Sequence, residues 1–215
     1  MRNVRVKICG ITNLKDALAA SDSGADALGF IFHEKSRRFI RPEAAGRIIR
    51  KLPPFIGLVG VFVDEGQAVI KKAIQKSGIN CIQLHGDEGP EFCDKISGST
   101  GLKVIKAFRI KGHLPPRGIK AYNTAAVLLD AFSEKAHGGT GRCFDWDIAI
   151  GAKKTGRAVI LSGGLNPENI ALAVKKVLPY AVDASSGLET APGVKDHKKI
   201  KAFIERAKGI KTVPT

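Results

Sequence analysis

The sequence has few cysteines, and none of them is spaced to bind a metal or to build a disulfide scaffold. They are Cys9, Cys81, Cys93 and Cys143, with no CxxC pair and no histidine at the spacing of a zinc site. Small disulfide-rich domains and structural zinc sites depend on such patterns. We therefore expect reduced thiols and no metal.

Long hydrophobic runs are also missing. The longest apolar stretches, such as Phe55–Val63, fall well short of the roughly 20 residues that a helix needs to cross a membrane. The amino terminus, Met1–Arg5, lacks the apolar segment of a secretion signal. These two absences predict a soluble, cytoplasmic protein that does not bind membranes.

Acidic residues are scarce relative to basic ones: 20 Asp and Glu stand against 35 Lys and Arg, a formal net charge of +15. Such a charge attracts polyanions, including nucleic acid, and also steers small anionic substrates. Basic pairs such as Lys71-Lys72 fall on exposed-looking helix positions, without the interleaved aromatic residues of a single-strand binder. We predict solvated helix faces and no nucleic-acid partner, with a polyanion-binding protein as the alternative.

Apolar strands alternate with amphipathic helices along the chain, a pattern typical of a parallel sheet with helical crossovers. The predicted strands are Val4–Cys9, Ala27–Phe32, Phe55–Val63, Cys81–Leu84, Lys103–Ala107, Ala126–Asp130, Ala158–Ser162 and Ala181–Ala184. The predicted helices are Asn13–Ser23, Pro42–Lys51, Glu65–Ser77, Gly89–Ile96, Trp146–Lys154, Pro167–Val177 and Lys195–Lys208. In 215 residues this pattern predicts an α/β fold, a single-domain (βα)8 TIM barrel over residues 1–215.

Two asparagines mark expected helix starts. Asn13 has Asp16 three residues later, and Asn166 precedes Pro167; both are typical signals of a helix N-terminus. The fifth crossover, Lys111–Asn123, is instead rich in glycine and proline, so we expect little helix there.

Two apolar runs near the carboxyl terminus, Ala158–Gly164 and Ala181–Gly187, break into glycine and hydroxyl-bearing residues. Glycine lets the backbone approach a ligand and turns free N–H groups toward it, and a nearby helix start adds a positive dipole end. Because the last two strands of a (βα)8 barrel commonly bind phosphate, these runs predict a phosphate cradle.

Residue alternation along each strand predicts which side chains point into the barrel. In the first strand Lys7 and Cys9 share one face, and the residues between them make an apolar face. Later strands place His85, Asp130 and Asp183 at or near their ends in the same way. Barrel enzymes carry out their chemistry at these ends, so the polar residues there are candidate site residues.

Short motifs in a fixed order span nearly the whole chain. They are Lys7–Thr12, Gly29–Phe32, Ser36–Phe39, Val59–Phe62, Gln83–Gly86, Leu128–Asp130, Gly138–Gly141, Phe144–Trp146, Ser162–Leu165 and Asp183–Gly187. Each motif alone is weak evidence. As an ordered set they are specific, and the chain resembles the phosphoribosylanthranilate isomerase family.

The resemblance implies a cofactor-free Amadori rearrangement in tryptophan biosynthesis. N-(5-phosphoribosyl)anthranilate, an aminoaldose, becomes the aminoketose 1-(2-carboxyphenylamino)-1-deoxyribulose 5-phosphate. An acid protonates the furanose ring oxygen and opens the ring to a Schiff base, and a base then removes the proton from sugar carbon 2. The family's base matches Cys9, and its acid matches Asp130.

The resemblance also implies where the substrate binds. Arg38 matches the position that faces the anthranilate carboxylate, where a planar fork suits two oxygens, and its neighbour Arg37 is the alternative. His85 is expected either to contact the substrate or to satisfy core hydrogen bonds, and Asp183 to orient the substrate through a hydroxyl or amine. The expected phosphate-binding residues are Gly141, Gly163, Gly164, Ser185, Ser186 and Gly187.

The neighbours of Cys9 and Asp130 indicate how each takes its role. A thiol acts as a base only as the thiolate, and Lys7 is a candidate cation to favour that form. Asp130 must hold a proton while substrate is bound, which an apolar setting after Leu128 and Leu129 would assist. From the residues alone, Cys9 is also compatible with a small buried hydrophobe and Asp130 with a turn or cap residue.

Further expectations concern the loop, the partners and the competing enzyme class. The glycine-rich segment Ala131–Phe144 is long for a barrel connection and is predicted to close over substrate, with a flexible surface loop as the alternative. We expect a small anionic phosphosugar as ligand, and a monomer or homodimer. Another phosphosugar barrel enzyme of tryptophan or histidine biosynthesis, such as indole-glycerol-phosphate synthase, would carry a catalytic Lys or Asp where Cys9 stands.

Overall fold

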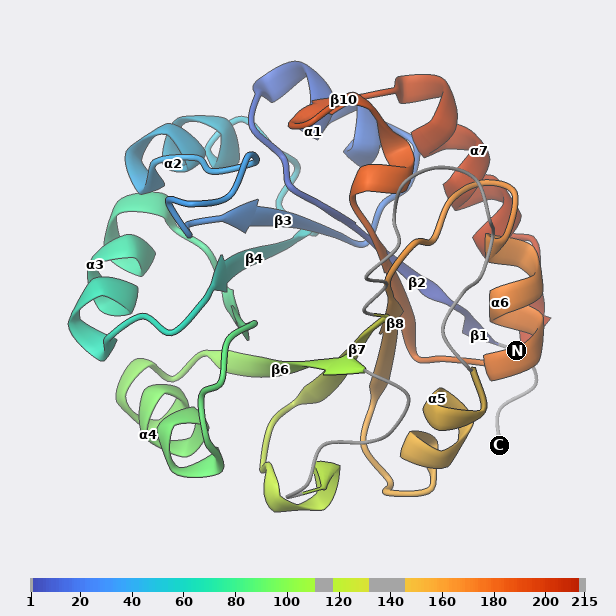
Figure 1. Cartoon of the computed structure of the whole chain (residues 1–215). Coiled ribbons are helices and arrows are strands. Elements are labelled where there is room, and N and C mark those ends of the chain that lie inside the picture. Colours follow the sequence, from blue (N-terminus) through green and yellow to red (C-terminus); the bar gives the residue numbers. More distant parts are fainter. Residues whose placement is uncertain (1, 111–117, 132–145, 213–215) are drawn as a thin grey trace.

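Eight parallel strands close into a barrel, which confirms the predicted fold class (Figure 1). The computed structural model describes residues 2–110, 118–131 and 146–212. The barrel strands are β2 (Arg5–Cys9), β3 (Ala27–Ile31), β4 (Gly57–Phe62), β5 (Cys81–Leu84), β6 (Lys103–Ile110), β7 (Ala126–Ala131), β8 (Val159–Ser162) and β9 (Ala181–Ala184). Each strand pairs with its neighbour in sequence, and β9 pairs back onto β2 to close the ring.

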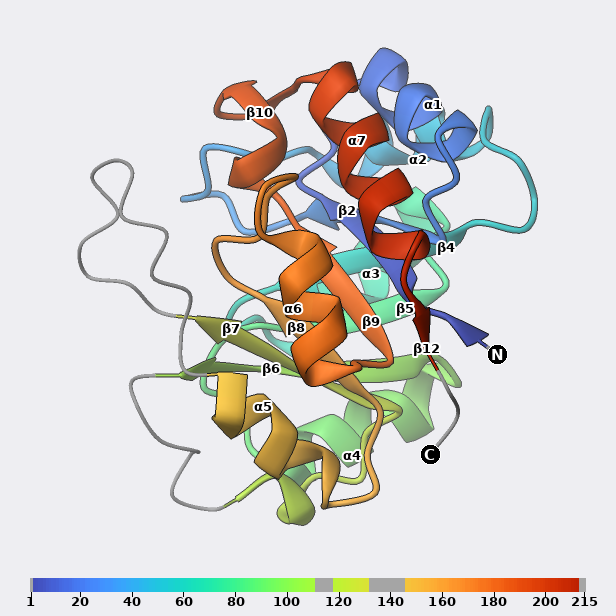
Figure 2. The same cartoon turned by 90° about the vertical axis from the view of Figure 1, so that its right-hand side faces the viewer.

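Helices surround the barrel on its outside (Figures 1 and 2). They are α1 (Leu14–Asp22), α2 (Pro42–Ile49), α3 (Gln67–Ser77), α4 (Pro90–Thr100), α5 (Trp146–Lys153), α6 (Ile170–Val177) and α7 (His197–Lys208). In the described part of the crossover between β6 and β7 there is one 3-10 turn, η1 (Ile119–Ala121), and residues 111–117 lie outside the described residues. This agrees with the expectation of little helix in that crossover.

Three helix starts lie two or more residues after the predicted ones: α3 begins at Gln67 instead of Glu65, and α6 and α7 also begin late. Asn13 caps α1 as predicted, because its side chain accepts a hydrogen bond from the backbone N–H of Asp16 at 2.9 Å. The Asn166 side chain instead accepts from the N–H groups of Glu168 and Asn169 in a turn, and α6 begins only at Ile170. A side chain that bonds the backbone locally offers it an alternative to the helix, so the predicted start at Pro167 was wrong.

The start of α7 was also predicted too early. The helix begins at His197, and Asp196 is its N-cap, accepting from the N–H groups of Lys198 and Lys199. Lys195 belongs to a short hairpin in which β10 (Glu189–Ala191) pairs antiparallel with β11 (Val194–Lys195). This hairpin follows the 3-10 turn η2 (Ser186–Leu188) and was not expected from the sequence.

The two ends of the described chain lie side by side. Strand β1 (Arg2–Asn3) pairs antiparallel with β12 (Lys211–Thr212) outside the barrel (Figure 2). In the part of the chain that the structure describes, no helix combines the length and the apolar content that crossing a membrane requires.

Alternate strand residues pack into two apolar layers. Outward-pointing side chains such as Val6, Ile8 and Leu129 fill the layer between barrel and helices. Inward-pointing side chains such as Leu128 and Ile160 form a smaller cluster inside the barrel. The alternation predicted for the strands is therefore confirmed, and it leaves the ends of the inward rows free for polar residues.

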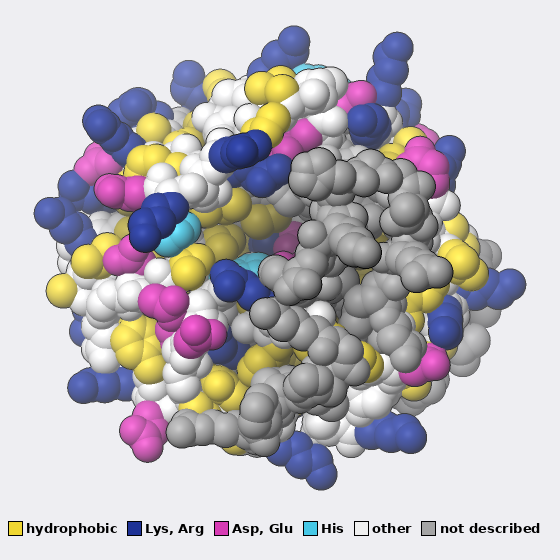
Figure 3. Space-filling model, viewed as in Figure 1, with side chains coloured by type: hydrophobic (Ala, Val, Ile, Leu, Met, Phe, Trp, Pro, Cys, Tyr) yellow, Lys and Arg dark blue, Asp and Glu magenta, His cyan; other side chains and the backbone are white. Residues whose placement is uncertain are grey.

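On the face shown in Figure 3, the basic side chains of the described residues do not gather in one patch. Figure 3 shows the barrel end-on, with lysine and arginine side chains spread along the outline and acidic side chains among them. On this face the excess of positive charge is therefore distributed, as expected for solvated helix faces.

A buried ion pair joins the loops that follow β4 and β5 to strand β6. The Lys106 ammonium lies 2.7 Å from Glu88 Oε2 and donates to the Gly86 carbonyl at 2.6 Å. Glu88 Oε1 accepts from the backbone N–H of Asp64 at 2.9 Å. Both charged side chains are almost fully buried, at 2% and 3% exposure, so each depends on the other for its neutralisation.

Replacing one partner of this pair is predicted to destabilise the fold. Lys106→Met leaves the Glu88 carboxylate buried without its cation, so we expect the free energy of unfolding to fall by about 3–5 kcal/mol. The control Lys201→Met removes an exposed pair with Glu205 and is expected to change it by less than about 1 kcal/mol. Urea unfolding measures both; similar stability of the two variants would contradict the role of the pair.

Candidate active site

A cavity of about 240 Å³ opens at the carboxyl ends of the barrel strands. The predicted site residues that line it are Cys9, Arg38, His85, Asp130, Gly163, Gly164, Asp183, Ser185, Ser186 and Gly187. Gly141 and most of the predicted lid, residues 132–144, lie outside the described residues. With Val61 of β4 also in the lining, residues from seven barrel strands or the loops after them converge on one space.

A larger groove of about 480 Å³ lies outside the barrel beside α1 and α2. Its lining includes Arg47, Arg50 and Lys51, and it contains none of the predicted site residues. In a (βα)8 barrel the carboxyl ends of the strands are where catalytic groups gather. The smaller cavity is therefore the candidate active site.

Cys9 enters the cavity from the end of β2, where it is almost fully buried. Its partner in the β2–β3 register is Gly29. A Cβ atom at Gly29 would lie 2.7 Å from Cys9 Sγ and 3.1 Å from Lys7 Cε. Only glycine at this position leaves room for both side chains within the barrel.

Lys7 and Asp183 form a buried ion pair beside Cys9. They are register partners across the β2–β9 closure, and their N–O distance is 2.9 Å. Burial lowers the pKa of Lys7, but Asp183 and the Cys9 sulfur together outweigh it and raise the pKa above its ordinary value. The ammonium of Lys7 therefore stays charged inside the barrel.

The pKa of the Cys9 thiol is raised, mainly because burial disfavours the thiolate. The positive charge of Lys7 acts in the opposite direction, and the negative charge of Asp183 adds to the effect of burial. The direction of the Lys7 contribution therefore agrees with the sequence hypothesis that this cation favours the thiolate. In the structure, however, the effect of burial is larger than that of Lys7, and the negative charge of Asp183 raises the pKa of the Cys9 thiol further.

A chain of polar contacts leads from the barrel wall to Asp130. Gln83 Nε2 lies 2.9 Å from His85 Nδ1, and His85 Nε2 lies 3.2 Å from Asp130 Oδ2. Among the described residues, Gln83 Oε1 has no hydrogen-bond partner. Turning this amide over would therefore place Oε1 on the imidazole and reverse the direction of donation along the chain. His85 is thus a group that can either donate to the Asp130 carboxyl or accept from it.

The Asp130 side chain is less enclosed than the sequence indicated. Leu128 is buried inside the barrel and Leu129 in the outer layer, but the Asp130 side chain is 32% exposed. Its described polar neighbour is His85. The setting expected to be apolar is therefore mixed, with an imidazole on one side of the carboxyl group.

The described residues that were predicted to form the phosphate cradle lie in the loops after β8 and β9, which are neighbouring strands. Gly163 and Gly164 have φ angles of 87° and 67°, a backbone that favours glycine. A Cβ at Gly187 would lie only 2.2 Å from the Leu165 carbonyl oxygen. The Ser185 hydroxyl is buried and has no hydrogen-bond partner in the part of the chain that the structure describes, so it is free to bind a ligand oxygen.

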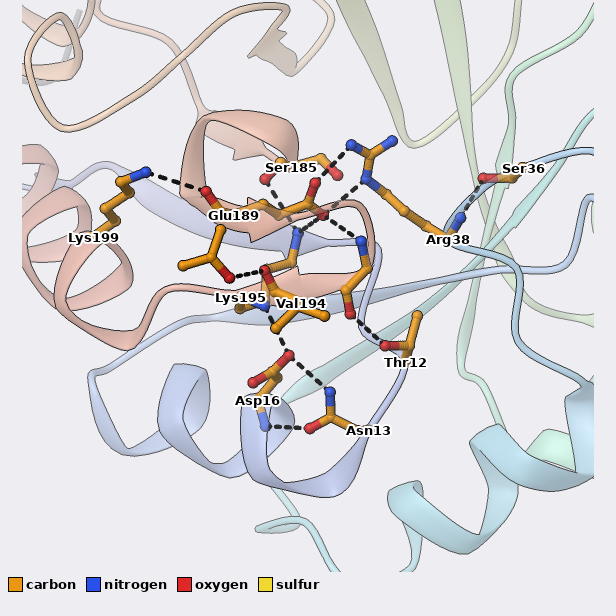
Figure 4. A network of polar contacts seen from close by, with 12 residues as sticks. Thr12, Asn13, Asp16, Ser36, Arg38, Ser185, Glu189, Val194, Lys195 and Lys199 are labelled. Carbon is orange, nitrogen blue, oxygen red and sulfur yellow. Dashed lines mark hydrogen bonds and ion pairs between the residues drawn. The ribbon is translucent and has the colours of Figure 1, made fainter.

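Arg38 lines the cavity next to this cradle, but part of its guanidinium is already engaged. Arg38 Nε donates to Glu189 Oε1 at 2.8 Å, and Nη2 donates to Glu189 Oε2 at 2.6 Å (Figure 4). Burial raises the pKa of Glu189, but hydrogen bonds from Arg38 and Lys195 outweigh it, and the net pKa lies below the ordinary value. Glu189 is therefore a carboxylate.

Sequence reasoning missed Glu189 and assigned Lys195 to a helix. A signal was present: Glu189 follows the Ser186–Leu188 turn directly, and Pro192-Gly193 between Glu189 and Lys195 is a typical turn pair. Recognising the Pro192-Gly193 pair as a turn would have predicted a hairpin between Glu189 and Lys195. It would not have predicted that the two side chains meet Arg38 from another loop.

Metal binding has no visible basis in the described residues. Within them, no three His, Cys, Asp or Glu side chains come together in an arrangement that could hold a metal ion. The acidic groups of the site are instead paired with basic or imidazole side chains.

The fold and the cavity together define a class of protein. A closed (βα)8 barrel with acid, thiol and imidazole groups at the strand ends, and a glycine-rich cradle on its last two strands, is typical of barrel enzymes that bind phosphorylated ligands.

Comparison with known proteins identifies the family within this class. The family model of N-(5'-phosphoribosyl)anthranilate (PRA) isomerase matches residues 6–206. A curated N-(5'-phosphoribosyl)anthranilate isomerase from Geobacter metallireducens is 55% identical over 205 residues, covering 95% of this chain and 99% of the relative.

Solved structures agree. The phosphoribosyl anthranilate isomerase from Thermotoga maritima is 46% identical with a TM-score of 0.86, covering 96% of this chain and 100% of that chain. A phosphoribosyl anthranilate isomerase in complex with reduced 1-(o-carboxyphenylamino)-1-deoxyribulose 5-phosphate is 45% identical with a TM-score of 0.83, at the same coverage. The chain therefore belongs to the N-(5'-phosphoribosyl)anthranilate isomerase family, whose members are isomerases of tryptophan biosynthesis.

The electrostatics of Cys9 lead to a first prediction about the site. Lys7→Met removes the charge that favours the thiolate and leaves Asp183 to oppose it, so Cys9 should ionise at a higher pH. The double variant Lys7→Met/Asp183→Asn, which leaves no unpaired buried charge, should shift in the same direction by less. The measurement is the pH dependence of iodoacetamide alkylation at Cys9, followed by peptide mass spectrometry. An unchanged or lower ionisation pH in both variants would rule out the contribution of Lys7.

The geometry of the two glycine-rich loops leads to a second prediction about the site. Gly187→Ala forces the new Cβ against the Leu165 carbonyl, so the loop must shift and lose hydrogen bonds to an anion. Affinity for inorganic phosphate should then fall about tenfold to hundredfold, measured by isothermal titration calorimetry. Gly151→Ala in α5 meets no atom within 4 Å and serves as the control. Equal phosphate affinity in both variants would exclude Gly187 from the cradle.

Proposed function

We propose that the chain converts N-(5-phosphoribosyl)anthranilate into 1-(2-carboxyphenylamino)-1-deoxyribulose 5-phosphate by a cofactor-free Amadori rearrangement, in one catalytic domain spanning residues 1–215. The observation that carries the proposal is that Cys9 and Asp130 line the same cavity as the glycine-rich cradle. The solved relative that holds the reduced aminoketose supports the same ligand class here.

The cradle and Arg38 bind the two anionic ends of the substrate. The 5-phosphate accepts hydrogen bonds from the loops at Gly163–Gly164 and Ser185–Gly187, with Gly141 as a further contact that lies outside the described residues. The anthranilate carboxylate pairs with Arg38. Since the sugar lies between these ends, its reacting carbons fall between Cys9 and Asp130.

Asp130 acts first, as the general acid. It gives its proton to the furanose ring oxygen; the ring C–O bond breaks, and the amine lone pair forms the C=N bond of a protonated Schiff base. His85, in contact with the Asp130 carboxyl group, orients that group and can return a proton to it.

Cys9 then acts as the general base. Its thiolate takes the proton from sugar carbon 2, and the C–H electron pair forms the C1=C2 bond of an enolamine while the C=N pair returns to nitrogen. The enolamine becomes the ketose when the Cys9 thiol gives its proton to carbon 1 and the Asp130 carboxylate takes the proton of the 2-hydroxyl. Both catalytic groups thereby return to their starting protonation states.

Asp183 is proposed to orient the substrate through a hydroxyl or amine. Its carboxylate lines the cavity and is held by Lys7 at 2.9 Å. The ion pair fixes the carboxylate at the cavity wall, where its oxygens can accept a hydrogen bond from a substrate hydroxyl or amine.

The residue type at position 9 also distinguishes the proposed isomerase from another phosphosugar barrel enzyme. Such an enzyme of tryptophan or histidine biosynthesis was expected to carry Lys or Asp at the position of Cys9. The sulfur at the end of β2, together with membership of the isomerase family, favours the Amadori rearrangement over that alternative and over polyanion binding.

Removing either catalytic group tests the assignment. Cys9→Ser and Asp130→Asn should each lower kcat by about a hundredfold to ten-thousandfold, the usual contribution of a general acid or base. Turnover of freshly prepared phosphoribosylanthranilate is followed by fluorescence. Cys81→Ser, another free cysteine of the barrel, is the control and should keep its activity. Full activity in either test variant would remove that residue from its role.

A further inference from the structure

Glu189 holds one edge of the Arg38 guanidinium in a two-point contact (Figure 4). Glu189 stands at the start of β10, and Arg38 lies in the loop after β3, so the contact joins two distant segments of the chain. The Glu189 side chain is 5% exposed and the Arg38 side chain 23%. The carboxylate is therefore the buried partner, and the arginine reaches from it toward the cavity that it lines.

Glu189 is itself held without help from Arg38. The Lys195 ammonium donates to Glu189 Oε1 at 2.8 Å and to the Ser185 carbonyl at 3.1 Å. The Lys195 side chain is completely buried, and β10 and β11 pair Glu189 directly with Lys195. Because the hairpin and the lysine fix the carboxylate, it is not free to swing away when a ligand arrives.

The remaining donors of Arg38 are available to a second acceptor. A guanidinium has five N–H donors, of which Glu189 uses the one on Nε and one on Nη2. Among the described residues, no hydrogen bond engages Nη1. The Nη1 and Nη2 nitrogens together form an end-on fork of the shape that suits another carboxylate. The cluster of Arg38, Glu189 and Lys195 also carries a net charge of one positive unit, which favours an anion at that fork.

We propose that Glu189 is a positioning residue that clamps Arg38 so that its end-on fork receives the anthranilate carboxylate, with Lys195 tying the clamp to the phosphate cradle. The proposal rests on the proposed pairing of Arg38 with that carboxylate. Through the Ser185 carbonyl, Lys195 connects the segment that binds one anionic end of the substrate to the residue that binds the other. The clamp therefore sets the distance between the two anionic subsites and selects a substrate that carries both charges.

The alternative is that Glu189 competes with the substrate for Arg38. In that case its removal would strengthen the binding of a carboxylated ligand. The clamp predicts that removing Glu189 weakens the binding of a carboxylated ligand. Without Glu189, the Arg38 side chain rotates freely in the unbound protein and must lose that freedom when the ligand binds.

The test measures how strongly the site prefers a ligand with the carboxylate. The probes are reduced 1-(2-carboxyphenylamino)-1-deoxyribulose 5-phosphate and the matching compound made with aniline, which lacks the carboxylate. The ratio of their dissociation constants, measured by calorimetry, reports the carboxylate contact alone. Glu189→Gln should lower this preference about tenfold, the contribution of a hydrogen bond to a charged group, while affinity for the aniline compound changes less than about twofold.

Lys199→Met is the matched control. Lys199 donates to the backbone carbonyl of Glu189 at 3.1 Å and does not touch its carboxylate, so the preference should stay as in the unaltered protein. Arg38→Lys is a second test that leaves Glu189 in place. A single ammonium keeps the charge but cannot serve two carboxylates with a fork, so this variant should lose as much preference as Arg38→Met.

The outcomes separate the clamp from the function on which it rests. If Arg38→Met keeps the full preference, Arg38 does not bind the carboxylate, and the proposed subsite fails. If Arg38→Met loses the preference for the carboxylated compound, Arg38 does bind the carboxylate. If Glu189→Gln or Arg38→Lys nevertheless keeps that preference, the clamp is overturned, but the proposed subsite is not. Stronger binding of the carboxylated compound by Glu189→Gln, or an equal loss for both compounds, also overturns the clamp.

Discussion

Closure of the barrel between its first and last strands is the constraint on which the geometry of the site depends. β2 pairs with β9 in a register that places Lys7 opposite Asp183, and their ion pair lies inside the barrel with an N–O distance of 2.9 Å. The same pairing brings Cys9, at the end of β2, next to the loop that carries Ser185. A thiol from the start of the chain and glycine-rich loops from its end become neighbours only because the ring closes at this seam.

Charges inside and around the cavity are arranged in compensated groups. Lys7 and Asp183 neutralise each other, and Glu189 neutralises one of its two cationic partners, Arg38 and Lys195. The local excess of one positive charge, rather than the net charge of the whole chain, lies where an anionic ligand would bind. Buried charges are tolerated in this way because each has a partner at hydrogen-bond distance.

The architecture was predictable because it follows from local patterns. A strand buried on both faces needs an apolar run, so all eight barrel strands were located to within one to three residues at each end from the sequence alone. Helix ends were predicted less well: α4 continues to Thr100 instead of ending at Ile96. Two further errors fell where side chains compete with regular structure. Asn166 bonds its own neighbours and delays α6, and Lys195 pairs in a hairpin instead of beginning α7.

By itself, the sequence determined which residues are candidates and which face of a strand each occupies, because alternation along a strand is a local property. It placed Cys9, Asp130 and the two glycine runs at strand ends before any distance was known. Only the tertiary structure decided that burial outweighs Lys7 at the Cys9 thiol, that His85 meets Asp130, and that Glu189 holds Arg38. Burial and pairing depend on distances between segments far apart in the chain, and residue spacing carries no information about those distances.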